Sequence, residues 1–167
     1  MTEARPTAAS SATARLRRIE VSVRVGTDLM AGSDDPLFIE LQGAFGREFR
    51  LAKARGKALR RGAEDVYVLG GPGDPDTNVG FPELNDPTVP PVALAGVIGV
   101  ALRKGQEPIP NVRGHGEMDD RLQVLAIEVR LVPDDGGPVR RFAREGPFWL
   151  GLVSGERISI PPAGDAR

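Results

Sequence analysis

Residues 19–43 read IEVSVRVGTDLMAGSDDPLFIELQG, which is two alternating runs joined by a loop rich in Gly and Asp. Apolar residues occupy every second position from Ile19 to Val25 and again from Leu37 to Leu41. Because the side chains of a strand point alternately to its two faces, each run predicts a strand that is buried on one face. The loop between the runs predicts a sharp connection.

The rest of the chain predicts more short strands, separated by turns rich in Gly, Pro and Asp. They are expected at residues 49–51, 66–69, 97–102, 122–132, 139–142, 148–153 and 157–160. A change of phase near Leu125 and Ala126 predicts a bulge, and the only helical candidate is Lys53–Arg60. We therefore expect an all-β fold, an eight-stranded antiparallel β-sandwich of two sheets.

A length of 167 residues fits one domain. Residues 1–15 are small and polar and predict a disordered tail, residues 16–161 the sandwich with a long loop at 70–91, and residues 162–167 a second tail. The core is expected at apolar strand positions: Val21, Val23, Val25, Leu37, Ile39, Leu41, Phe49, Val66, Val68, Val100, Leu102, Val124, Ile127, Val129 and Trp149.

The composition excludes several classes of function. With 22 basic and 23 acidic residues and 5% aromatics, the chain has neither a global field nor stacking platforms for nucleic acid. The absence of cysteine excludes disulfides and thiolate catalysis. No apolar run in the sequence is long enough for a signal peptide or a membrane-spanning helix, so we expect a cytoplasmic protein.

Catalytic patterns are weak. His115 is the only histidine, and Asp119 or Asp120 could orient it, but no motif places a serine for a catalytic triad. The run Gly70–Gly73 lacks the Gly-Lys-Ser/Thr of a phosphate-binding loop. We therefore predict that the chain is not an enzyme.

Two segments resemble the PLAT/LH2 family, the small β-sandwich domains attached to lipoxygenases, pancreatic-type lipases, bacterial toxins and polycystin-like membrane proteins. Residues 25–43 resemble its first signature, T-G-D-x-x-x-A-G-T-D-a-x-V-y-i-x-L-x-G, although Thr27 replaces the first Asp and Ser33 the second Thr. Residues 59–67 resemble the second, F-x-x-G-x-x-D-x-F. Residues 122–129 and the Trp149–Leu150 pair resemble later family positions.

The glycines of these motifs predict tight geometry. Gly26 and Gly32 permit a close connection between two strands. Gly62 is expected to set a bend before Asp65, whose carboxylate would accept hydrogen bonds from loop amides. All of these positions are explained equally well as architecture without a ligand.

The resemblance implies a non-catalytic interaction module that binds a protein or a lipid surface, with calcium as a candidate cofactor. Calcium prefers six to eight oxygen ligands. Its candidate ligands are concentrated in one loop: Thr27, Asp28, Ser33, Asp34 and Asp35. Asp74 and Asp76 lie in a second loop that could reach the same end. The alternative interpretation is a solvated acidic loop or a set of turn residues.

The resemblance also implies that apolar loop tips contact lipid or a partner. The candidates are Leu29, Met30 and Phe81, although Met30 could instead fold back on the sandwich. A protein is the first expected partner and a peripheral membrane surface the second. Edge strands and two basic groups, Arg15, Arg17, Arg18 and Arg140, Arg141, Arg144, offer further contact surfaces. The alternative function is that of a structural subunit in a larger protein assembly.

Overall fold

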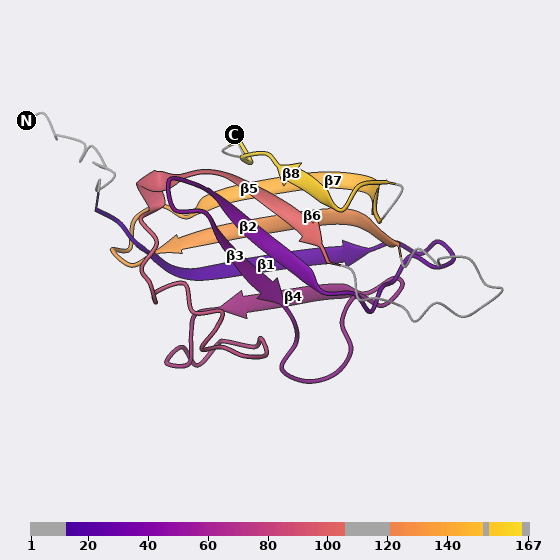
Figure 1. The fold of residues 1–167 in the computed structure, drawn as a ribbon, viewed down its shortest axis with the longest axis horizontal. Coiled ribbons are helices and arrows are strands. Elements are labelled where there is room, and N and C mark those ends of the chain that lie inside the picture. Colours follow the sequence, from indigo (N-terminus) through magenta and orange to yellow (C-terminus); the bar gives the residue numbers. More distant parts are fainter. Residues whose placement is uncertain (1–12, 106–120, 152–153, 165–167) are drawn as a thin grey trace, which may run out of the picture.

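The computed structural model describes residues 13–105, 121–151 and 154–164, which form two four-stranded antiparallel sheets packed face to face (Figure 1). One sheet has the strand order β4-β1-β6-β7 and the other β3-β2-β5-β8. The strands are β1 (Leu16–Val25), β2 (Leu37–Gly43), β3 (Arg47–Leu51), β4 (Glu64–Leu69), β5 (Val97–Lys104), β6 (Leu122–Pro133), β7 (Arg140–Leu150) and β8 (Arg157–Ile160). A short 3-10 turn, η1 (Leu94–Gly96), precedes β5. The predicted eight-stranded sandwich is confirmed.

Strand β1 is central in its sheet because it pairs with β4 on one side and with β6 on the other. Val21 lies opposite Tyr67 on β4 and opposite Val129 on β6, and all three side chains are buried. Strand β2 holds the same position in the second sheet, between β3 and β5. The two alternating runs of the sequence are therefore the central strands of the two sheets.

The predicted core is correct in β1, β2, β3, β5 and β6 but wrong in β4. There the buried side chains are Asp65, Tyr67 and Leu69, whereas Val66 is 50% exposed and Val68 is half-buried. Four consecutive apolar residues carry no period of two, so the pairing of Tyr67 with Val21 decides which face turns inward. Trp149 is only half-buried and packs on the edge of the core.

The predicted helix at Lys53–Arg60 does not form. These residues bend from β3 to β4, with left-handed backbone at Gly56 (φ 79°) and Leu59 (φ 55°). The left-handed residues break the helical repeat, and Leu59 is buried in the core. One strand, β7, takes the place of the predicted strands at 139–142 and 148–153, of which residues 152–153 lie outside the described residues, and it bulges at Gly146–Pro147 opposite Leu125. The predicted irregularity near Leu125 and Ala126 is confirmed.

Both open sides of the sandwich are covered. Residues 70–93 run along the edge strands β3 and β4. The Asn78 side chain accepts a hydrogen bond from the Val68 amide and donates one to the Val66 carbonyl, and Val79 forms a β-bridge with Lys53. On the other side, Pro162 bridges to Phe142 on β7, and the Ala163 amide donates to the Arg141 carbonyl. Covered edges cannot accept a further strand easily, which argues against the edge-strand pairing considered from the sequence.

Tyr67 provides a test of the core. Its hydroxyl is buried, its pKa is raised by that burial and by nearby Asp65, and it has no hydrogen-bond partner among the residues that the structure describes. Because an unpaired buried hydroxyl is unfavourable, Tyr67→Phe should leave the free energy of unfolding unchanged or raise it by up to about 1 kcal/mol. Tyr67→Ala should lower it by about 3–5 kcal/mol through loss of the ring. Urea unfolding followed by circular dichroism measures both, and a clear loss in the Phe variant would contradict the unpaired hydroxyl.

Candidate functional site

Two connections between the sheets lie side by side at one end of the sandwich. The motif loop (residues 26–36) links β1 to β2, and the basic loop (residues 52–63) links β3 to β4. The Gly62 amide donates to the Gly26 carbonyl at 2.8 Å, and the Ser33 amide donates to the Leu59 carbonyl at 3.1 Å. The two signature segments of the sequence therefore hold each other in place.

Gly32 and Gly62 allow this close approach. A Cβ on Gly32 would lie 2.7 Å from the Leu59 carbonyl oxygen and 2.9 Å from the Arg61 nitrogen, which is too close for any side chain. Gly62 has a φ of 72° in the left-handed region, where glycine is favoured. Close packing therefore favours glycine at position 32, and the left-handed backbone favours it at position 62.

Asp65 fixes the basic loop through one hydrogen bond and one ion pair. Its Oδ2 accepts a hydrogen bond from the Leu59 amide at 2.7 Å, and its other oxygen pairs with the Lys53 ammonium. The Asp65 side chain is almost completely buried. Because a buried carboxylate is costly unless it is paired and hydrogen-bonded, this residue fixes the path of the loop rather than exposing a charge to a ligand.

The motif loop turns its three carboxylates in different directions. Asp28 is exposed, and its Oδ2 accepts a hydrogen bond at 2.6 Å from the Gln123 side chain. Asp34 faces outward, with one carboxylate oxygen 4.0 Å from the Lys57 ammonium. Asp35 faces inward and pairs with the Lys104 ammonium. Asp34 is exposed whereas its neighbours Ser33 and Asp35 are buried, so Asp34 and Asp35 face opposite ways and cannot share a ligand easily.

The two hydroxyl residues of the proposed ligand set also lie apart. Thr27 is exposed, and its methyl group is beside Gly62. Ser33 is buried, and its Oγ accepts a hydrogen bond at 3.1 Å from the Asp35 amide. Among the residues that the structure describes, no three His, Cys, Asp or Glu side chains converge on a position that could hold a metal ion.

Lys104 is a buried cation behind this loop. It is the last residue of β5, its side chain is 2% exposed, and its ammonium pairs with Asp35. The backbone holds it on both sides, because the Lys104 amide donates to the Glu156 carbonyl and the Gly105 amide to the Pro36 carbonyl, each at 2.7 Å. Nothing in the sequence motif points to this lysine, since it lies 69 residues from its partner.

An apolar tip projects from the motif loop. Leu29 is 79% exposed and Met30 57% exposed, and Met30 has a left-handed backbone with a φ of 63°. Met30 therefore does not fold back into the core. Phe81 is also exposed, but it belongs to the 70–93 loop along β3 and β4, which Figure 1 shows well away from the motif loop. Leu29 and Met30 form one tip, and Phe81 is a separate feature.

The signature motifs do not point to the cations of the basic loop, but the charge pattern of the sequence does. The stretch from Phe49 to Ala63 has six basic residues and no acidic residue. The first lies in β3 and the others in the basic loop: Arg50, Lys53, Arg55, Lys57, Arg60 and Arg61. Arg55, Arg60 and Arg61 are exposed and make no ion pair with any residue in the described ranges. They make the basic loop itself positive, although the whole chain carries a charge of −1.

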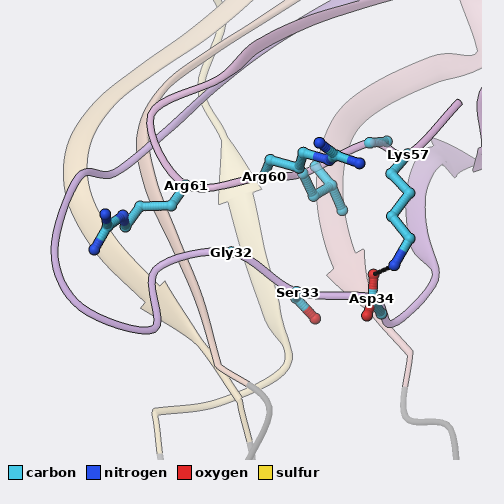
Figure 2. Close-up of a pocket in the computed structure, with 8 residues that line it drawn as sticks. Gly32, Ser33, Asp34, Lys57, Arg60 and Arg61 are labelled. Atoms are coloured by element: carbon cyan, nitrogen blue, oxygen red, sulfur yellow. Dashed lines mark ion pairs between the residues drawn. The ribbon is translucent and has the colours of Figure 1, made fainter.

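An open pocket of about 300 Å³ lies between the two loops. Figure 2 shows Lys57 and Arg60 above Ser33 and Asp34, with Arg61 directed the opposite way. Asp34 partly neutralises Lys57, whereas Arg60 has no acidic neighbour at hydrogen-bond distance within the described chain. The pocket is therefore an open hollow in which the cations of the basic loop outnumber the single carboxylate of Asp34.

Asp74 and Asp76 do not reach the motif loop. Asp74 makes two hydrogen bonds of 2.7 Å to Arg18, and Asp76 one of 2.9 Å, near the beginning of β1. The motif loop follows the other end of that strand. Burial opposes ionisation of Asp74, but the Asp76 amide and Arg18 outweigh it and hold the pKa of the carboxyl below its ordinary value.

The two basic groups noted in the sequence are largely occupied. Arg18 pairs with Asp74, and Arg141 with Glu128 on the neighbouring strand. Arg140 donates to the Leu94 and Val97 carbonyls, and Arg144 to the Ser159 carbonyl. Arg15 and Arg17 are exposed at the start of β1. His115, Asp119 and Asp120 lie outside the described residues.

Known structures share this arrangement of two sheets. The chain superposes on the alpha-toxin of an avian strain of Clostridium perfringens with a TM-score of 0.57 at 15% identity, over 91% of this chain and 33% of the toxin. For the Clostridium absonum alpha-toxin the TM-score is 0.58 at 13% identity, over 92% and 34%. The chain has the PLAT/C2-like fold. A coral 8R-lipoxygenase, described with calcium activation via a C2-like domain, gives 0.52 at 16% identity over 87% of this chain.

The PLAT-like chain spans about a third of the length of the two toxins and 17% of the lipoxygenase. The similarity is therefore to one small domain of each enzyme. No protein-family model and no curated protein matches the sequence. Among the described residues, no helix is long and apolar enough to cross a membrane.

Gly32 tests how tightly the two loops are packed. A Cβ at this position would press on the backbone of Leu59 and Arg61, so Gly32→Ala should lower the free energy of unfolding by about 1–3 kcal/mol. Gly73 is the matched control, because a Cβ there meets nothing within 4 Å, and Gly73→Ala should be neutral or slightly stabilising. Equal effects of the two substitutions in urea unfolding would show that the loops are not in close contact.

Proposed function

We propose that this PLAT-like domain is a non-catalytic module that docks on an anionic lipid surface through the motif loop and the basic loop. The observation that carries the proposal is one juxtaposition. The exposed Leu29–Met30 tip stands between Thr27 and Gly32, and both of these residues lie against the basic loop, whose exposed arginines have no ion pair with any described residue. An apolar tip beside exposed cations is the combination that suits the boundary between lipid chains and anionic headgroups.

Neither the apolar tip nor the exposed arginines alone would hold the domain stably on a membrane. Insertion of one Leu or Met side chain contributes about 1.5–3 kcal/mol if it is fully buried. Each Arg or Lys near an anionic surface contributes about 1 kcal/mol, so Arg55, Arg60 and Arg61 supply about 3 kcal/mol together. Stable peripheral binding takes two such signals acting at one place, which this end of the domain provides. Binding should be reversible and sensitive to salt, since the cations are exposed.

Sedimentation with vesicles tests the proposal. The protein should sediment with phosphatidylcholine vesicles that contain phosphatidylserine, sediment much less with phosphatidylcholine alone, and be released as salt is raised. Arg60→Glu with Arg61→Glu should weaken binding at least tenfold, because two attractive charges become repulsive, about 2–4 kcal/mol. Leu29→Ser with Met30→Ser should weaken it by a similar factor through loss of the apolar anchor.

Matched variants separate a specific site from general charge. Arg15→Glu with Arg17→Glu makes the same charge change at the far end of β1, and Ile98→Ser removes an exposed apolar side chain from β5, close to the residue that pairs with Gly43 at the end of β2. Both should leave vesicle binding nearly unchanged. The proposed site is wrong if these controls weaken binding as much as the test variants, or if the unaltered protein fails to bind anionic vesicles.

A calcium-assisted form of this docking is the second candidate. It is supported by the likeness to the coral 8R-lipoxygenase, in which calcium activation is ascribed to a C2-like domain. The exposed carboxylates of Asp28 and Asp34 would be the first ligands to consider on this loop. The same sedimentation in calcium and in chelator distinguishes the two forms, because an ion bridge requires calcium whereas direct contact by arginine does not.

A protein-binding surface at the opposite end is favoured by a separate observation. Phe45, at the tip of the β2–β3 hairpin, is 86% exposed, and Ile98 on neighbouring β5 is 80% exposed, close to where Val97 pairs with Gly43. Such a pair of exposed apolar side chains also suits a structural subunit that assembles with copies of itself. If the chain assembles in this way, Phe45→Ser with Ile98→Ser should convert an oligomer to a monomer on size-exclusion chromatography. A monomer before substitution would leave no self-association for these residues to mediate.

A further inference from the structure

The three carboxylates of the motif loop each face a nitrogen of the chain itself. Asp28 accepts from the Gln123 amide, Asp34 lies opposite Lys57, and Asp35 pairs with Lys104. These three nitrogen partners, each in the described part of the chain, come from three different segments. The pair that includes Lys104 is the buried one, whereas Asp34 and Lys57 are exposed and 4.0 Å apart.

We propose that Lys104 is the resident cation of the motif loop, and that its ammonium takes the place of a metal ion in keeping this loop folded. The proposal concerns the loop on which the proposed function rests, and it selects the form of docking that needs no calcium. Its basis is the presence of a positive charge at the position where the loop turns a carboxylate inward.

Burial is the first reason. The Lys104 side chain is 2% exposed and the Asp35 side chain 9%, so neither charge is compensated by bulk water. A buried carboxylate needs a cation or several hydrogen-bond donors, and Asp35 has an ammonium at contact distance. A divalent ion brought to the same oxygen would have to displace or repel that ammonium.

Position is the second reason. Lys104 is the last residue of β5 and lies opposite Leu37, the first residue of β2, immediately after the motif loop. The Gly105 amide donates to the Pro36 carbonyl, so the backbone around Lys104 is joined to the loop as well. The cation is therefore delivered by the neighbouring strand and is fixed as soon as the second sheet forms.

The chemistry of the remaining donors agrees with this assignment. The Ser33 hydroxyl already accepts a hydrogen bond from the Asp35 amide, which turns the two side chains toward the interior. Asp28 and Asp34 are on the exposed side of the loop, away from Asp35. Calcium would need six or more oxygens around one point, and the described residues of the loop distribute theirs over three nitrogen partners.

Thermal unfolding of the full chain tests the inference. The melting temperature of the unaltered protein should be the same in millimolar calcium and in excess chelator. Lys104→Met keeps the length of the side chain but removes the ammonium that faces buried Asp35, and it should lower the melting temperature by about 10 °C. Lys104→Met combined with Asp35→Asn should recover more than half of that loss, because the buried negative charge is removed together with the buried positive one.

The outcomes separate this inference from the proposed function. A melting temperature that rises in calcium but no longer does so in Asp35→Asn, or a Lys104→Met variant as stable as the unaltered chain, would overturn the role of Lys104. If Lys104→Met does not fold, the double variant and the calcium comparison still decide the question. Vesicle binding that requires calcium and loses this requirement in Asp35→Asn would also overturn it while leaving docking intact. Failure of the protein to bind vesicles at all would remove the docking function without bearing on the melting temperatures.

Discussion

The chain has to cross from one sheet to the other at the end of β1, and the rest of this end of the molecule depends on that crossing. A crossing buries polar backbone and side-chain groups that the strands do not pair, and each buried group has to find a partner. Here the Gln123 backbone holds Gly26 and Ala31, and Lys104 neutralises Asp35. The basic loop, which crosses in the reverse direction, closes over it through Gly62 and Leu59.

The residues at this end of the sandwich form an inner and an outer layer. The inner layer holds the buried ion pairs of Lys104 with Asp35 and of Lys53 with Asp65, which fix the paths of both loops. The outer layer holds what remains exposed, namely the Leu29–Met30 tip and the arginines at 55, 60 and 61. The two inner ion pairs leave the outer arginines without an ion pair to any described residue, and the proposed docking depends on these arginines.

The two open sides of the sandwich differ from the end that carries the motif loop and the basic loop, because other segments of the chain cover them. The 70–93 loop hydrogen-bonds along β4 through Asn78 and is anchored to β3 through Asn85, whose side chain accepts from the Arg50 amide and donates to the Gly80 and Phe81 carbonyls. The segment after β8 covers β7. The loops at the ends of the sandwich, by contrast, keep exposed tips such as Leu29 and Met30.

The fold class and the two central strands could be predicted from the sequence, because a period of two in Ile19–Val25 and Leu37–Leu41 admits only one buried face. The sequence also marked the two signature segments that meet at the site. Where the period was absent, as in Val66–Leu69, only pairing with β1 decided that Tyr67 turns inward and Val66 outward. The pairing of Asp35 with Lys104 and the separation of Asp74 from the motif loop also came from tertiary structure alone. Both depend on which strand lies beside which, and contacts between residues 69 positions apart leave no local trace in the sequence.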